Sequence, residues 1–79
     1  MNLTEQNIYT IIYSLLQHKP LAFSPTYNLH TAYFNKILNK QELLNTFARN
    51  FGSTFGLTEP ILQQLSTVRD LTTYILKDV

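Results

Sequence analysis

The chain contains no cysteine, which excludes disulfide bonds and thiolate metal sites. Only 14% of its residues are charged and the formal net charge is +1, so it lacks the basicity that is typical of nucleic-acid-binding domains. No stretch approaches the roughly 18 apolar residues that a membrane-spanning helix needs, and the N-terminus has no basic segment leading into a long apolar run. These absences predict a soluble, cytoplasmic protein whose partner is neither a membrane nor a nucleic acid.

The apolar residues that are present suffice for one core. The chain has 79 residues and is 44% hydrophobic, a composition typical of globular rather than disordered proteins. A chain of this length buries roughly 60 to 65% of its extended surface on folding. Because internal repeats and flexible linkers are absent from the sequence, residues 1–79 are predicted to form a single domain, which we expect to be a monomer.

Apolar residues recur at helical spacing in the segment 4–18, which predicts a first helix there. Thr4 can cap its start, and Pro20 prevents its continuation. The residues expected to face the core are Ile8, Ile11, Ile12, Leu15 and Leu16.

A second helix is predicted to end near Asn50, because Gly52 can supply a left-handed stop. It begins at Ile37 or at Asn39, since Asn39 and Glu42 have the spacing of a capping box. The residues expected to face inward are Leu43, Leu44, Phe47, Ala48 and Phe51.

Two further helices are predicted near the C-terminus. Thr58 can cap a short one over residues 58–65, in which a proline is tolerated in the first turn. The last helix lies in the closing segment 66–79 and opens with Thr67 and Asp70 in capping-box spacing. The residues on its apolar face are Val68, Leu71 and Ile75. No segment predicts a strand, so the sequence predicts an all-α fold with four helices.

The segment 20–35 has no sustained period, and its two prolines interrupt local structure. It is nevertheless too apolar for a solvated loop, since it contains Leu21, Phe23, Tyr27, Leu29, Tyr33 and Phe34. A connection of this length without secondary structure is uncommon in a compact domain. We therefore expect a long loop that packs against the helices.

Two motifs match known proteins at the right separation. The closing TVRDLTTYI is similar to the last helix of carrier domains, and LHTAYFNKILNKQELLNTFARNFG, residues 29–52, can be laid without gaps on their central segment. Over about residues 4–78 the chain thus resembles the acyl and peptidyl carrier protein family. The resemblance implies a four-helix bundle with a long packed loop between the first two helices and a short third helix.

The chain departs from the family at the residue on which the family's activity depends. Carrier proteins attach 4'-phosphopantetheine to a serine hydroxyl, whereas here Ile37 occupies the serine position, flanked by Lys36 and Leu38. Isoleucine has no nucleophilic atom, so no phosphodiester can form there. The chain has four serines, and none of them is a good replacement: Ser14, Ser24, Ser53 and Ser66. The sequence therefore predicts no cofactor.

The surface also departs from the family's pattern. The resemblance implies a strongly acidic second helix that docks on basic patches of partner enzymes. Here the positions expected to be exposed on that helix are neutral or basic: Asn39, Lys40, Gln41, Asn45, Arg49 and Asn50. Because electrostatic steering depends on the sign of the charge, partners of acidic carriers should bind this chain slowly or not at all.

Seven residues are candidates for binding a partner, namely Tyr33, Phe34, Lys36, Ile37, Leu38, Lys40 and Arg49. Each has an alternative role. Ile37 either covers the end of the core or contacts a partner, and the three cations form either a solvated face or a binding patch. The aromatic residues either pack within the domain or offer a stacking platform.

No catalytic triad, phosphate-binding loop or carboxylate pair is identifiable, and His18 and His30 lack the spacing of metal ligands. We therefore expect no enzymatic activity. The leading hypothesis is a carrier-like module that has lost phosphopantetheinylation and binds another protein, such as a synthase, a synthetase or an assembly factor. One alternative is an atypical acyl or peptidyl carrier of fatty-acid, polyketide or non-ribosomal peptide biosynthesis, loaded elsewhere or holding an acyl chain non-covalently. Another is a small helical regulator that binds nucleic acid.

Overall fold

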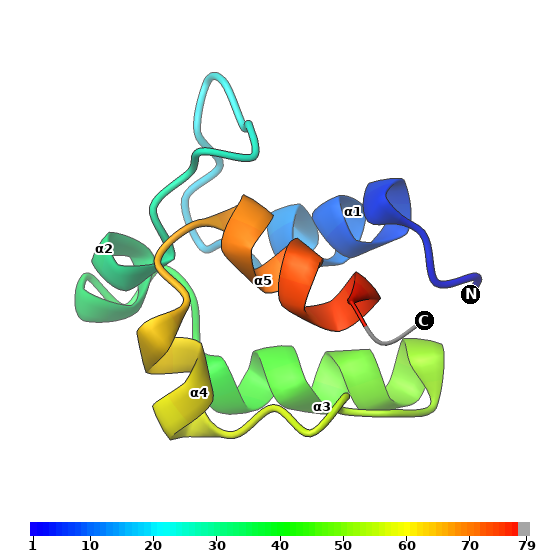
Figure 1. Cartoon of the computed structure of the whole chain (residues 1–79). Coiled ribbons are helices and arrows are strands. Elements are labelled where there is room, and N and C mark those ends of the chain that lie inside the picture. Colours follow the sequence, from blue (N-terminus) through cyan, green and yellow to red (C-terminus); the bar gives the residue numbers. More distant parts are fainter. Residues whose placement is uncertain (78–79) are drawn as a thin grey trace.

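Helices form the framework of residues 1–77, the part of the chain that the computed structural model describes. The helices are α1 (Glu5–Leu15), α2 (Leu29–Phe34), α3 (Lys40–Phe51), α4 (Glu59–Gln64) and α5 (Val68–Leu76). α1 packs against both α3 and α5, and α3 packs against α4 (Figure 1). The described residues contain no strand, so the prediction of an all-α fold is confirmed. Residues 78 and 79 of the predicted last helix lie outside the described part.

Every helix begins after a threonine or asparagine whose side-chain oxygen accepts a backbone N–H from the first turn. The capping residues are Thr4, Asn28, Asn39, Thr58 and Thr67. The predicted capping box of α5 is confirmed, because Thr67 and Asp70 exchange both hydrogen bonds. Asn39 caps α3, which therefore begins at Lys40, after the later of the two predicted starts.

The first helix is shorter than predicted, because α1 ends at Leu15 rather than at residue 18. The backbone of Leu16 is extended, and the N–H of Gln17 donates to the carbonyl of Ile37 at 2.8 Å instead of continuing the helix. The ammonium group of Lys19 donates to the carbonyls of Ser14 and Leu16 and thereby satisfies two groups at the helix end.

The prediction of an unbroken loop over residues 20–35 is wrong, because α2 occupies Leu29–Phe34. Asn28 caps this short helix, and Leu29 and Ala32, three residues apart, are both buried in the core. Phe23 and Tyr27 pack against the core as expected. The expected packing of the segment is therefore incomplete, because Leu21 and Phe34 are exposed.

Backbone hydrogen bonds connect the end of the long loop to the start of α5. The N–H of Leu29 donates to the carbonyl of Ser66 at 2.7 Å, and the N–H of Val68 donates to the carbonyl of Tyr27 at 3.1 Å. The N–H of Arg69 donates to the carbonyl of Pro25 at 2.8 Å. These bonds fix the position at which α2 begins, although the loop before it extends away from the helices (Figure 1).

The core lies where α1, α3 and α5 meet. Its most completely buried side chains include Ile8 and Ile12 of α1, Leu43 and Phe47 of α3, and Leu71 and Ile75 of α5. The Phe47 ring also contacts the rings of Phe51 and Phe55 at centroid distances of 5.9 and 6.2 Å. The inward position predicted for Ala48 is wrong: Ala48 is exposed, and Thr46 is buried instead. The Thr46 hydroxyl accepts a hydrogen bond from Arg49, so its burial leaves no polar group unpaired.

Phe47 is the central residue of this core, and we expect Phe47→Ala to lower the free energy of unfolding by about 3–5 kcal/mol. This loss is a large part of the roughly 5–15 kcal/mol that stabilises a small domain. Urea denaturation followed by circular dichroism measures it. Gln63→Ala, at an exposed position of α4, is the control and should change stability by less than about 0.5 kcal/mol. A loss below about 1 kcal/mol for Phe47→Ala would contradict the described packing.

Candidate functional site

The turn between α2 and α3 contains the residues that the sequence marks as candidates. Lys36 has a left-handed backbone with φ of 59°. Its N–H donates to the carbonyl of Tyr33 at 3.1 Å, and the N–H of Ile37 donates to the carbonyl of Ala32 at 2.8 Å. This pair of bonds is the Schellman motif that closes many helices, and its left-handed position is usually occupied by glycine. Lys36 therefore adopts a conformation that is unfavourable for a side chain with a Cβ.

The backbone amides of Ile37 and Leu38 are both hydrogen-bonded within this turn. The N–H of Leu38 donates to the same Ala32 carbonyl at 3.2 Å, and the carbonyl of Ile37 accepts the N–H of Gln17 at 2.8 Å. The Ile37 side chain is half-buried and packs against the core, as the first of its two proposed roles requires. Leu38 is only 2% exposed, so its side chain lies within the core and not on a binding surface.

A shallow hollow of about 380 Å³ lies beside this turn. It is lined by Tyr33, Lys36, Leu38, Asn39, Lys40, Gln41 and Glu59. Four of the seven candidate residues thus lie at one hollow, and the ammonium group of Lys40 lies 5.2 Å from the centre of the Tyr33 ring. Arg49 lines a separate hollow farther along α3 with Glu42 and Asn45. Glu59 could not be chosen from sequence spacing, because it lies at the hollow only through the packing of α4 on α3.

The side chain of Phe34 extends from the end of α2 into solvent with 87% of its surface exposed. Its neighbour Tyr33 differs, because the Tyr33 hydroxyl is buried and has no hydrogen-bond partner among the described residues. Burial raises the pKa of Tyr33 to about 12. One turn earlier, Nε2 of His30 is also buried without a partner in the described part of the chain. The alternation of exposed and buried aromatic surface on so short a helix cannot be deduced from residue spacing.

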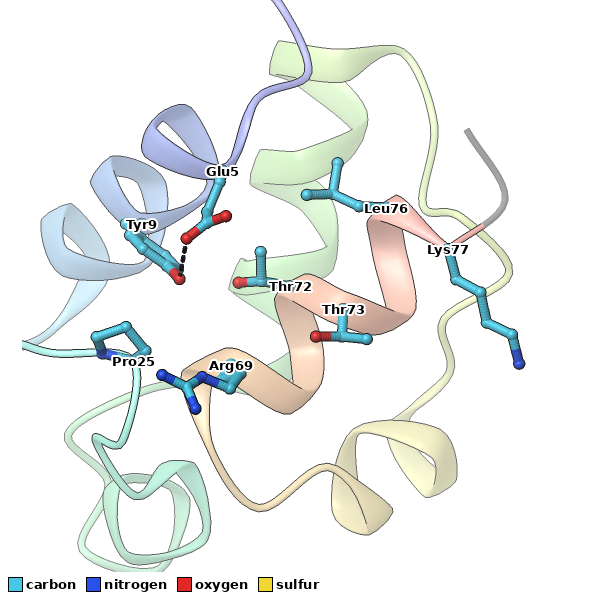
Figure 2. A pocket seen from close by; sticks show the side chains of 8 residues that line it. All are labelled: Glu5, Tyr9, Pro25, Arg69, Thr72, Thr73, Leu76 and Lys77. Carbon is cyan, nitrogen blue, oxygen red and sulfur yellow. Dashed lines mark hydrogen bonds between the residues drawn. The ribbon is translucent and has the colours of Figure 1, made fainter.

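A second hollow, of about 410 Å³, lies between α1 and α5 (Figure 2). The Tyr9 hydroxyl donates to the Glu5 carboxylate there at 2.7 Å, and burial together with this interaction raises the pKa of Tyr9. The Thr72 hydroxyl is already used, because it donates to the carbonyl of Val68. Figure 2 shows the Lys77 side chain pointing away from the other lining residues. Sequence reasoning did not identify this hollow, since its two walls are far apart in the chain.

Residues 1–77 contain no group of three or more histidine, cysteine, aspartate or glutamate residues that could hold a metal ion. None of the helices in this part of the chain is long and apolar enough to cross a membrane.

Comparisons of the chain with protein-family models, curated proteins and solved structures give no significant match. The resemblance to carrier proteins therefore depends on the aligned sequence motifs alone. The function has to be inferred from the residues of this chain and from their arrangement.

The left-handed conformation of Lys36 leads to a first prediction about this turn. We expect Lys36→Gly to raise the free energy of unfolding by about 0.5–1 kcal/mol, because glycine adopts this conformation without a Cβ penalty. The control is Lys40→Gly in the first turn of α3, where glycine should lower stability. Urea denaturation measures both changes. Destabilisation by Lys36→Gly would show that the turn is not left-handed.

The buried hydroxyl of Tyr33 leads to a second prediction. Because the pKa is about 12 in the folded chain and 10.0 is the ordinary value, the unfolded chain ionises first as pH rises. The resulting stability is therefore fully present below pH 10 and is lost between pH 10 and about 12. We expect Tyr33→Phe to lose less stability over this interval than the wild type does. Below pH 10 the variant should be as stable as the wild type or more so, because it buries no unpaired hydroxyl. Urea denaturation of both proteins at pH 10 and at about pH 12 measures the two losses. Identical dependence of stability on pH in the variant and the wild type would contradict the prediction.

Proposed function

We propose that this chain is a non-catalytic, carrier-protein-like module that is not phosphopantetheinylated and that acts by binding a biosynthetic enzyme or an assembly factor. The observation that supports this proposal most is the chemistry and packing of Ile37. In the alignment with carrier proteins this residue takes the place of the modified serine, and it offers only hydrocarbon. Its amide and carbonyl are both hydrogen-bonded, and its side chain packs against the core.

The surroundings of Ile37 support a binding role rather than a catalytic one. The neighbouring hollow has two lysines and one glutamate at its edge, without a paired nucleophile and base. An exposed aromatic ring, that of Phe34, lies on the preceding helix. Aromatic side chains are enriched where proteins bind one another, and positive charges favour the encounter with a partner of opposite charge. The sign of the charge differs from that of acidic carriers, so the partner is expected to differ from theirs.

The first half of the proposal is tested by incubating the purified chain with coenzyme A and a phosphopantetheinyl transferase of broad specificity, followed by intact-mass measurement. We expect no mass increase for the wild type. The double variant Lys36→Asp, Ile37→Ser recreates the Asp-Ser-Leu sequence of carriers and should gain the pantetheine group. Modification of the wild type would contradict the proposed loss. A double variant that folds but stays unmodified would contradict the correspondence of Ile37 with the family's serine.

The second half is tested by purifying a tagged chain from its native cells under gentle conditions. We expect a protein partner to be recovered in a constant ratio to the chain. The matched control is the same chain destabilised by Phe47→Ala, which should recover less of the partner. A folded chain that is always recovered alone would contradict a role in protein binding.

A further inference from the structure

The charge of the chain is unevenly distributed. Residues 29–51, which include α2 and α3, contain Lys36, Lys40 and Arg49 but only one carboxylate, Glu42. In the remainder of the chain, carboxylates outnumber Lys and Arg by one. Glu59 of α4 also lines the hollow beside Lys36 and Lys40, so the local excess is one positive charge, close in the chain to the exposed Phe34. A partner that approaches this part of the molecule meets a positive potential.

The side chains concerned are held by a backbone that is fixed at both ends of α2. Asn28 caps its start at 2.8 Å, and the Schellman motif around Lys36 closes its end. The N–H of Leu29, paired with Ser66, ties the same helix to the start of α5. Lys40 is placed over the Tyr33 ring. A fixed backbone loses no conformational entropy when its side chains bind, so such a surface favours association.

We propose that Phe34, Lys36 and Lys40 form a docking surface for an acidic segment of a partner protein. In this arrangement Phe34 inserts into an apolar socket of the partner, and the two lysines pair with carboxylates beside that socket. The inference rests on the proposed function, because it names the chemistry of the partner that the module binds. It also accounts for a lysine at a left-handed position where glycine would be more favourable.

A protein fits this surface better than a nucleic acid or an anionic membrane does. Nucleic-acid affinity comes mostly from many contacts with phosphates, and this hollow has only two lysines. The carboxylate of Glu59 at the same edge limits how many anionic groups can bind there, and it can accept hydrogen bonds from the amide groups of a polypeptide. An exposed aromatic side chain can anchor a small protein interface, and two cations nearby in the chain favour a partner of opposite charge.

The test uses the full chain, labelled with nitrogen-15, and a synthetic helical peptide that combines glutamates with a leucine stripe. We expect chemical-shift changes centred on residues 33–40 that shrink at about 1 M salt, where charges are screened over roughly 3 Å. A peptide with lysines in place of the glutamates should bind at least about tenfold more weakly. A peptide without the leucines should also bind more weakly, because it has no apolar group to meet Phe34.

Matched variants localise the effect. Phe34→Ser and the pair Lys36→Glu, Lys40→Glu should each weaken binding by about tenfold or more. Leu21→Ser removes an equally exposed apolar side chain from the loop, and Lys77→Glu reverses a charge near the C-terminus. Neither control should change binding. Unchanged nitrogen-15 spectra outside the substituted sites show that each variant is folded.

Several results would overturn this inference. The inference fails if the acidic peptide does not bind or binds no more tightly than the basic one. It fails if the two control variants lose as much affinity as the docking-surface variants. It also fails if single-stranded RNA or anionic vesicles bind the same residues more tightly than the acidic peptide does. The proposed function has a separate outcome. If Phe34→Ser still recovers the partner from native cells, the module binds proteins through another surface, and only the docking surface is refuted.

Discussion

The carbonyl oxygen of Ala32 accepts hydrogen bonds from two successive amides, those of Ile37 and Leu38. This shared acceptor forces the chain to reverse after α2 and requires the left-handed backbone of Lys36. The reversal brings the Ile37 carbonyl to the N–H of Gln17, so the end of α1 depends on it as well. It also buries Leu38 and positions Asn39 to cap α3. A local backbone constraint therefore sets the relative placement of three helices.

The same constraint connects the fold with the proposed function. An isoleucine offers no nucleophilic atom to which a prosthetic arm could be attached. In this chain the amide and carbonyl of Ile37 are hydrogen-bonded, and its side chain packs against the core. What remains accessible beside it is an aromatic ring and two ammonium groups, which suit recognition rather than group transfer. The proposed loss of the modification site and the proposed binding surface both agree with this arrangement of the backbone.

Much of the helical framework could be predicted from the sequence, because the apolar spacing and the capping residue of a long amphipathic helix lie within the helix's own segment. The periodic apolar residues of α1, α3 and α5 and their threonine or asparagine caps are of this kind. The helix α2 was missed because only Leu29 and Ala32 mark its buried face. The early end of α1 was missed because its cause, the Ile37 carbonyl, lies far along the chain.

The candidate site was predictable to a lesser degree. The resemblance to carrier proteins made Tyr33, Lys36 and Lys40 candidates for binding a partner, and the three residues line one hollow. It could not show that Leu38 is buried or that Glu59 approaches from α4, since both depend on tertiary packing. The exposure of Phe34, next to a largely buried Tyr33, depends on how α2 is oriented against the core.

Hydrogen exchange of individual backbone amides, followed by nitrogen-15 NMR, tests the central constraint most directly. The account requires the amides of Gln17, Ile37 and Leu38 to exchange slowly and together, because the three hydrogen bonds belong to one closed turn. If these amides exchange as fast as that of Ala22 in the exposed loop, the turn does not form and the structural role assigned to Ile37 is contradicted.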